Sequence, residues 1–167
     1  VSVLGYSILT QREQAQKHIG YLPEHNPLYT DMYVKEYLSY VADIYKAPKR
    51  RIEESIALTQ LESHAHKKIH TLSKGYRQRI GLASTLLHDP DVLILDEPTN
   101  GLDPQQILEI RQIIRDLGRE KVVLLSSHIM QEIQAVCQRV LILHQGKIIL
   151  NEPMTALQDK EQTVEVL

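Results

Sequence analysis

Residues 72–103 read LSKGYRQRIGLASTLLHDPDVLILDEPTNGLD, and this stretch decides the fold. Its residues 92–95 form an apolar run without polar alternation, which is typical of a strand buried on both faces of a parallel sheet. Asp96 and Glu97 end that run. Because ligands of open α/β sheets bind at the carboxyl ends of the strands, the two acids predict a site for a metal-bound nucleotide. A polar turn after a strand would give the same local pattern.

Ser73 lies before a run of apolar residues at helical spacing, so we expect it to be a helix N-cap. The free N–H groups and the positive dipole end of a helix N-terminus attract phosphate. Gly75 would let the backbone approach such a ligand closely. An ordinary capped helix has the same sequence pattern, so Ser73 by itself leaves both interpretations open.

The acids at residues 96 and 97 are predicted to have different roles. In phosphoryl transfer one carboxylate holds Mg²⁺, and a neighbouring acid orients and deprotonates the attacking water. We assign Asp96 to Mg²⁺ and Glu97 to the general base. His128 follows the apolar run 122–125 and is expected at the same end of the sheet, where an imidazole can contact the γ-phosphate.

The order of these motifs resembles that of the ATP-binding cassette (ABC) transporter ATPases. Residues 72–78 are similar to the family signature LSGGQ, in a variant that resembles exporter-type and gliding-motility-associated cassettes. Residues 92–96 resemble the Walker B strand, with Glu97 as its catalytic glutamate. The other similar segments are the D-loop at 100–103, the switch-histidine loop at 126–128 and the Q-loop segment at 19–24. Motifs in family order at ordinary spacing make the resemblance specific.

This resemblance implies an α/β fold with a partial, P-loop NTPase-like parallel sheet core and a helical subdomain inserted before the Walker B strand. It divides the partial ATPase domain 1–167 into a sheet and Q-loop segment (1–30), a helical subdomain with the signature (31–88) and the remainder (89–167). It implies ATP and Mg²⁺ as cofactors. For catalysis it implies Glu97 and His128. For Mg²⁺ it implies Asp96 and, through a water molecule, Glu24. For nucleotide binding it implies Ser73, Lys74, Gly75, Tyr76, Gln78, Asp103 and Glu24.

Two residues depart from the family pattern. Lys74 stands where the signature has its first glycine, and Glu24 stands where the family has a glutamine. A carboxylate at residue 24 can still accept a hydrogen bond from metal-bound water, but it adds negative charge near Mg²⁺ and phosphate. The coupling role that the resemblance implies for this position is therefore less secure for a glutamate than for the family's glutamine.

The phosphate-binding motif G-x-x-x-x-G-K-[ST] is absent from the 167 residues. That loop supplies several backbone donors and a lysine. At roughly 1.5 kcal/mol per charge-assisted bond, five lost bonds remove about 7 kcal/mol. We therefore expect these residues alone to bind ATP poorly and to be ATPase-inactive, and we interpret the chain, which begins with Val1, as a fragment of an ATPase.

Composition limits the partners. A formal net charge of −2 provides no basic field for nucleic acid, and no apolar run is long enough for direct membrane insertion. The single cysteine, Cys137, fits a reducing compartment. The resemblance implies a cytoplasmic protein, peripheral on the inner face of the cell membrane, with transmembrane permease subunits and a second ATPase subunit in a head-to-tail dimer. A soluble ABC ATPase acting on DNA or ribosomes and a degenerate, non-hydrolysing binding module remain alternatives.

Hydrophobic periodicity predicts the other elements. Short strands or strand ends are expected at 3–9 and 18–22. Strands are expected at 122–125, 140–143 and 148–150, with a further one beginning at 161–167. Helices are expected at 31–45, 50–61, after Ser73, from Pro104 to Gly118, at 129–137 and at 153–159. The tyrosines of the 31–45 helix favour core packing, while Tyr29 and Tyr33 are candidates for a partner groove. His64, His66 and His70 do not align on one helical face, which argues against a metal site.

Overall fold

The computed structural model describes residues 1–161. The chain forms two compact units, Val1–Ser126 and Ser127–Leu167, and each is described by itself. The first unit contains the parallel sheet and the helices that carry the signature. The second contains a two-stranded antiparallel sheet and two helices.

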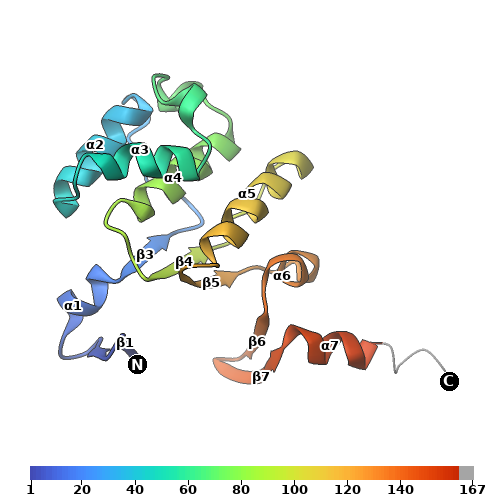
Figure 1. Cartoon of the computed structure of the whole chain (residues 1–167). Coiled ribbons are helices and arrows are strands. Elements are labelled where there is room, and N and C mark those ends of the chain that lie inside the picture. Colours follow the sequence, from blue (N-terminus) through green and yellow to red (C-terminus); the bar gives the residue numbers. More distant parts are fainter. Residues whose placement is uncertain (162–167) are drawn as a thin grey trace. The chain divides into compact units, whose positions relative to one another are not determined.

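A three-stranded parallel sheet forms the centre of the first unit (Figure 1). Its strands are β3 (Ile19–Leu22), β4 (Val92–Asp96) and β5 (Val122–Ser126), in the order β3-β4-β5. The register places Leu22 beside Leu95 and Asp96 beside Ser126. All three strands therefore end at one edge, where Asp96 is the last residue of β4. The chain has the α/β, P-loop NTPase-type fold that the sequence predicts.

The two faces of this sheet differ in burial. Leu22, Leu93 and Leu95 are almost completely buried and lie on one face. On the other face, Tyr21 of β3 and Leu124 of β5 are more than half exposed, although the register aligns both with Ile94. Because side chains alternate between the faces of a strand, one face of the sheet is packed and the other is open in the described chain.

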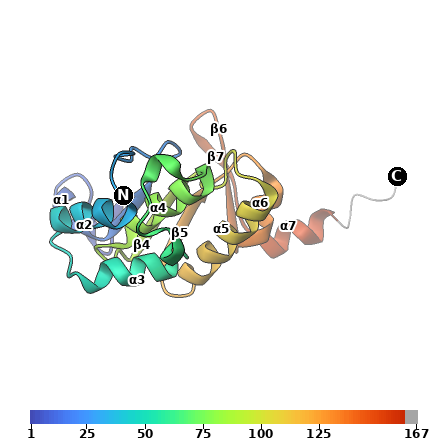
Figure 2. The ribbon, with the colours of Figure 1, turned by 90° about the horizontal axis from the view of Figure 1, so that it is seen from above.

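Helices α2 (Val34–Tyr45), α3 (Arg50–Leu58) and α4 (Lys74–Leu86) pack against one another (Figure 2). Two 3-10 turns, Glu62–His64 and Ile69–Thr71, connect α3 to α4. The buried residues Leu38, Ile56 and Ile80 each come from a different helix of one hydrophobic core. The sequence predicts all three helices, but α2 begins at Val34 because Tyr33 is its extended N-cap, and α3 ends before residue 61.

The prediction of short strands or strand ends at 3–9 is confirmed only in part. The structure forms a small antiparallel hairpin from β1 (Ser2–Val3) and β2 (Tyr6–Ser7), followed by helix α1 (Arg12–Lys17), which the sequence analysis missed. Leu4 and Gly5 between the strands have positive φ angles of 48° and 87°. This left-handed backbone reverses the chain, so a continuous strand cannot form.

Helix α5 (Pro104–Leu117) leads into β5, and its buried Ile110, Ile113 and Ile114 form the predicted apolar face. The second unit contains α6 (Met130–Val136), β6 (Arg139–His144), β7 (Lys147–Pro153) and α7 (Met154–Glu161). These confirm the predicted helices and hairpin to within a few residues. Glu161 belongs to α7 and not to a strand, and the rest of the strand predicted at 161–167 lies outside the described residues.

Among residues 1–161, no helix combines the length and the apolar character that crossing a membrane requires.

Candidate active site

The carboxyl end of β4 brings Asp96 and Glu97 together with Ser126 of β5. The Ser126 hydroxyl donates to Asp96 Oδ1 at 2.6 Å, and it accepts from the Glu97 backbone N–H at 3.0 Å. Glu97 has a φ of 45°, a left-handed backbone that few non-glycine residues adopt. One hydroxyl thus orients the Asp96 carboxylate and holds the backbone of Glu97 in its unusual conformation.

A tight turn follows Glu97 and leads to α5. Asn100 N–H donates to the Glu97 carbonyl at 3.1 Å, and Leu102 N–H donates to the Thr99 carbonyl at 3.2 Å. Asp103 is the N-cap of α5, since its Oδ1 accepts from the Gln106 N–H at 2.9 Å. Residues 97–103, here called the D-loop turn, are therefore held by their own backbone bonds and by the cap of α5.

Ser73 is the N-cap of α4, as the sequence predicts. Its hydroxyl accepts from the Tyr76 N–H at 3.4 Å and from Gln106 Nε2 of α5 at 3.3 Å. At Gly75, an added Cβ would lie 2.5 Å from Gln106 Cδ, so any side chain here would have to displace that of Gln106. The beginning of α4 thus lies directly against the beginning of α5.

A solvent-open cavity of about 310 Å³ lies between these two helices. Its lining includes the predicted nucleotide residues Gly75, Tyr76 and Asp103, together with Arg79 and Glu109. Lys74 reaches past the cavity toward the D-loop turn, because its Nζ would be 2.3 Å from a Cβ placed on Gly101. Several residues predicted from the signature and the D-loop are therefore neighbours in the structure.

Tyr76 packs against the helical part of the unit. Its ring stacks on that of His64, with 3.8 Å between the centroids, and its centroid lies 5.4 Å from the Arg79 guanidinium carbon. Burial lowers the pKa of His64, and the positive charges of Lys67 and Arg79 lower it further. A neutral imidazole is therefore favoured against the Tyr76 ring.

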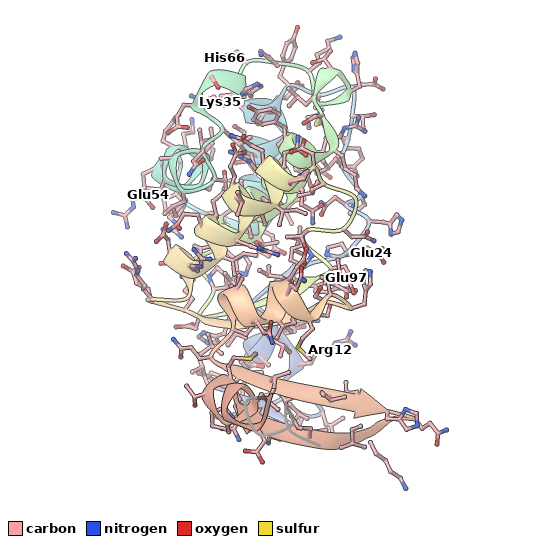
Figure 3. The ribbon with its side chains drawn as sticks, turned by 90° about the vertical axis from the view of Figure 1, so that its right-hand side faces the viewer. Arg12, Glu24, Lys35, Glu54, His66 and Glu97 are labelled. Carbon is pink, nitrogen blue, oxygen red and sulfur yellow. The ribbon has the colours of Figure 1, made fainter. Side chains whose placement is uncertain are left out.

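Two further predicted residues are engaged in side-chain hydrogen bonds. Gln78 is buried and accepts from Asn26 Nδ2 at 2.7 Å. Glu24 accepts from Asn100 Nδ2 at 2.7 Å, and its carboxylate lies 3.8 Å from the His25 ring nitrogen. Figure 3 labels Glu24 and Glu97, which lie on the same side of the first unit. The bond to Asn100 ties Glu24 to the turn that begins at Glu97.

The acids at this sheet edge suit a magnesium ion that is bound together with phosphate. Mg²⁺ prefers oxygen ligands and is usually held by one or two carboxylates, with water and phosphate completing its shell. Asp96, oriented by Ser126, supplies such a carboxylate. Within residues 1–161 there is no group of three or more histidines, cysteines or acids that could hold a metal by themselves. The protein residues therefore fit a nucleotide-borne Mg²⁺.

His128 belongs to the second unit, where it precedes α6. Nearby, Ser127 donates to Glu132 at 3.2 Å and accepts from the Ile129 N–H at 3.1 Å, which fixes the start of that helix. The proximity of His128 to Glu97 that the sequence analysis expects stays a prediction.

The sequence analysis missed the contacts made by Ser126, Asn26 and Gln106. Ser126 could have been found from the parallel register, because two strands that end together place their last side chains side by side. Asn26 and Gln106 carry no comparable signal. Their partners, Gln78 and Ser73, are 52 and 33 residues away in the sequence.

Comparison with known families agrees with this geometry. A family model described as "ABC transporter" matches residues 2–100, which is more than half of the chain. The chain belongs to the ABC transporter family. The match includes the signature, the Walker B strand and both acids at its end. The family resemblance inferred from the motifs is confirmed.

Relatives in this family are ATP-binding proteins. The chain is 45% identical over 152 residues to the uncharacterized ABC transporter ATP-binding protein YhcH of Bacillus subtilis, covering 89% of this chain and 50% of YhcH. It is 34% identical to the Nod factor export ATP-binding protein I of Burkholderia pseudomallei, covering 89% of this chain and 51% of that protein. The chain thus spans about half the length of these two ABC relatives.

A solved structure supports the same fold. The ABC protein cbiO1 of Clostridium perfringens, described as part of the transporter complex cbiONQ, superposes with a TM-score of 0.83 at 26% identity. The alignment covers 96% of this chain and 66% of cbiO1. The arrangement of sheet and helices is therefore that of an ABC ATP-binding subunit.

Proposed function

We propose that this chain is part of the ATP-hydrolysing subunit of an ABC membrane transporter, and that the transporter is an exporter. The observation that carries the proposal is the pair Asp96 and Glu97 at the end of β4, oriented by Ser126 beside the N-termini of α4 and α5. The exporter assignment draws on relatives such as the Nod factor export protein. Peripheral attachment to the cytoplasmic face of the membrane through permease subunits follows from the same proposal.

In the proposed reaction, Glu97 accepts a proton from the water that attacks the γ-phosphate of ATP, and the products are ADP and phosphate. Asp96 would hold Mg²⁺, and Glu24 would contribute to the same site through water. When bound, the ion would neutralise charge on the phosphates. His128 aligns the water and the γ-phosphate from the switch-histidine loop.

Nucleotide contacts from the signature complete the proposal. Ser73 and the N–H groups at the start of α4, at Lys74 and Gly75, face a phosphate of ATP that is held by a second subunit in a head-to-tail dimer, with Tyr76 beside them. Asp103, the N-cap of α5, and Gln78, a buried residue of α4, complete the surface that faces the nucleotide. A glycine-rich phosphate loop of the G-x-x-x-x-G-K-[ST] type supplies the other half of each site.

Replacement of the proposed base tests this function in the full-length protein. Glu97→Gln removes the proton acceptor and keeps the shape, so ATP turnover should fall by about 10²–10⁴-fold, which is the usual contribution of general-base catalysis. The matched control is Glu120→Gln, the same change at an exposed residue just beyond α5. Turnover of the Glu97 variant at the wild-type rate would refute the assignment. Absence of turnover in the unmodified protein would favour a non-hydrolysing binding module.

A further inference from the structure

The segment that follows β3 reaches two different parts of the first unit with two side chains. Glu24 accepts a hydrogen bond from Asn100 of the D-loop turn at 2.7 Å. Two residues later, Asn26 donates to Gln78 of α4, also at 2.7 Å. The partners are separated by 76 and 52 residues in the sequence, respectively. Residues 24–26 therefore form a bridge between the D-loop turn and the helix that begins with the signature.

The Asn26 end of this bridge is closely packed. Gln78 is only 5% exposed. One turn further along α4, a Cβ added to Gly81 would lie 2.4 Å from Asn26 Oδ1 and 2.7 Å from Nδ2. The Asn26 carbonyl in turn accepts from the Leu28 N–H at 2.9 Å, which fixes the local backbone. The Asn26 amide thus fits a space that exists only because residue 81 is a glycine.

The Glu24 end of the bridge meets the D-loop turn, which is also held by its own backbone bonds, by the Ser126 hydroxyl and by the cap of α5. Asn100 uses its backbone N–H within the turn and its side-chain amide for Glu24. Lys74 approaches the same turn at Gly101 from the first residue of α4. Displacement of residues 24–26 therefore changes the restraint on the D-loop turn, even when Lys74 stays in place.

We propose that Asn26 and Gln78 are positioning residues that set the spacing between the signature end of α4 and the D-loop turn. A buried amide that loses its partner is left unsatisfied, so the pair resists separation. Neither residue needs to touch the nucleotide for this role. The catalytic consequence of that spacing rests on the proposed function, whereas the mechanical link itself does not.

Hydrogen exchange measures the link directly in the full-length, nucleotide-free protein. Gly81→Ala should displace the Asn26 amide while improving the helix propensity of α4. We expect the amides of residues 97–103 to exchange at least threefold faster, with the protection of residues 79–86 unchanged or higher. A general loosening of α4 would instead raise exchange along the helix itself. Thr85→Val is the matched control, because Thr85 is buried in α4 but bonds only to Leu82 of its own helix.

A second pair of variants separates loss of the bond from loss of the side chain. Gln78 Nε2 is buried and has no hydrogen-bond partner among the described residues. In Asn26→Asp the carboxylate can accept from this Nε2 after the Gln78 amide turns over, so protection of the D-loop turn should be retained. Asn26→Leu, of similar size but without hydrogen-bonding atoms, should raise exchange as much as Gly81→Ala. The double variant Gly81→Ala with Asn26→Leu should add little to either single change.

Unchanged exchange at residues 97–103 in both Gly81→Ala and Asn26→Leu would overturn the proposal. Equal deprotection by the Thr85→Val control would also overturn it, because the effect would then be general. This measurement needs no ATP, so it remains informative if the protein does not hydrolyse the nucleotide. Conversely, failure of the link would leave the roles proposed for Glu97 and Asp96 untouched.

Discussion

At the scale of single residues, the Ser126 hydroxyl contacts both acids of the candidate site. It donates to the side chain of Asp96 and accepts from the backbone of Glu97, so two groups of different proposed function depend on one oxygen. A hydrogen bond to a charged group contributes about 1.5–3 kcal/mol. The geometry of the acids is therefore set by β5 as well as by β4.

Ser126→Ala tests this dependence. The substitution removes both bonds and leaves Asp96 free to rotate, so we expect ATP turnover of the full-length protein to fall about tenfold, equivalent to about 1.4 kcal/mol. The Mg²⁺ concentration needed for half-maximal turnover should rise as well. Ser2→Ala, at an exposed serine of β1, is the control, and a similar loss in both variants would argue against a specific role for Ser126.

The environment of His88 makes the stability of the fold depend on pH. Its Nε2 donates to the Ile19 carbonyl at 3.0 Å, and its ring stacks on that of Tyr45 with 4.3 Å between the centroids. Its Nδ1 is buried, and no residue within 1–161 forms a hydrogen bond with it. Burial lowers the pKa of His88, although the bond to Ile19 and the charge of Asp89 act in the opposite direction. The folded state therefore favours the neutral imidazole.

The lowered pKa of His88 means that the fold is less stable at acidic pH. Below its ordinary pKa of 6.5, His88 binds a proton more readily in the unfolded chain, so its stabilising contribution is present above pH 6.5 and is lost as the pH falls. We expect His88→Gln to reduce the difference in melting temperature between pH 7.5 and pH 5.5 by a few degrees. Thermal unfolding at the two pH values checks this, with His66→Gln, at an exposed position, as the control. An unchanged difference would contradict the prediction.

At the scale of elements, an ion pair joins the signature helix α4 to α5. Arg79 of α4 is almost fully buried and bonds to Glu109 of α5 and, at 3.3 Å, to Gln60. Its guanidinium also faces the Tyr76 ring. A buried charge that loses its partner destabilises a protein strongly, whereas removal of both charges is often tolerated. The two helices are therefore held together by a pair whose members depend on each other.

Glu109→Gln leaves the Arg79 charge without its counterion. Because Glu109 is partly exposed, we expect a loss of about 1–3 kcal/mol in the free energy of unfolding, less than for a fully buried pair. Arg79→Met combined with Glu109→Leu should recover part of this loss. Chemical denaturation of the full-length variants, with Glu120→Gln as the control, gives the comparison. A double variant that is less stable than Glu109→Gln would contradict the account.

At the scale of the whole molecule, the parallel sheet has one open face in the described chain. Parallel sheets are normally covered on both faces, yet Tyr21, Val122 and Leu124 are exposed. The chain also spans only about half the length of the relatives considered above. We propose that further parts of an ABC subunit cover this face.

The isolated 167 residues should accordingly bind ATP at least a hundredfold more weakly than the full-length protein, because the phosphate-loop donors are absent from their sequence. Isothermal titration with Mg²⁺-ATP checks this. A circular dichroism spectrum of the same sample must show native helix content for a negative result to count. Equal affinity for the two proteins would refute the expectation.

Local sequence patterns determined most of the elements that carry the site. Ser73 and Asp103 were predictable as helix caps or motif residues, and the strand before Asp96 followed from its apolar run. The hairpin at the N-terminus escaped prediction because its form depends on the left-handed backbone at Leu4 and Gly5, which apolar periodicity does not encode. Helix α1 has a short sequence with one buried residue, so it carries little periodic signal.

The sequence by itself determined the family, most of the helices and strands after residue 18, and the identity of the two acids, because caps, periodicity and ordered motifs are properties of neighbouring residues. Only the tertiary structure decided which side chains meet across the fold. Ser126 contacts Asp96 because parallel strands end in register, and Asn26 reaches Gln78 because Gly81 leaves room for its amide. Such contacts join residues far apart in the chain, and packing selects them from many chemically equivalent alternatives.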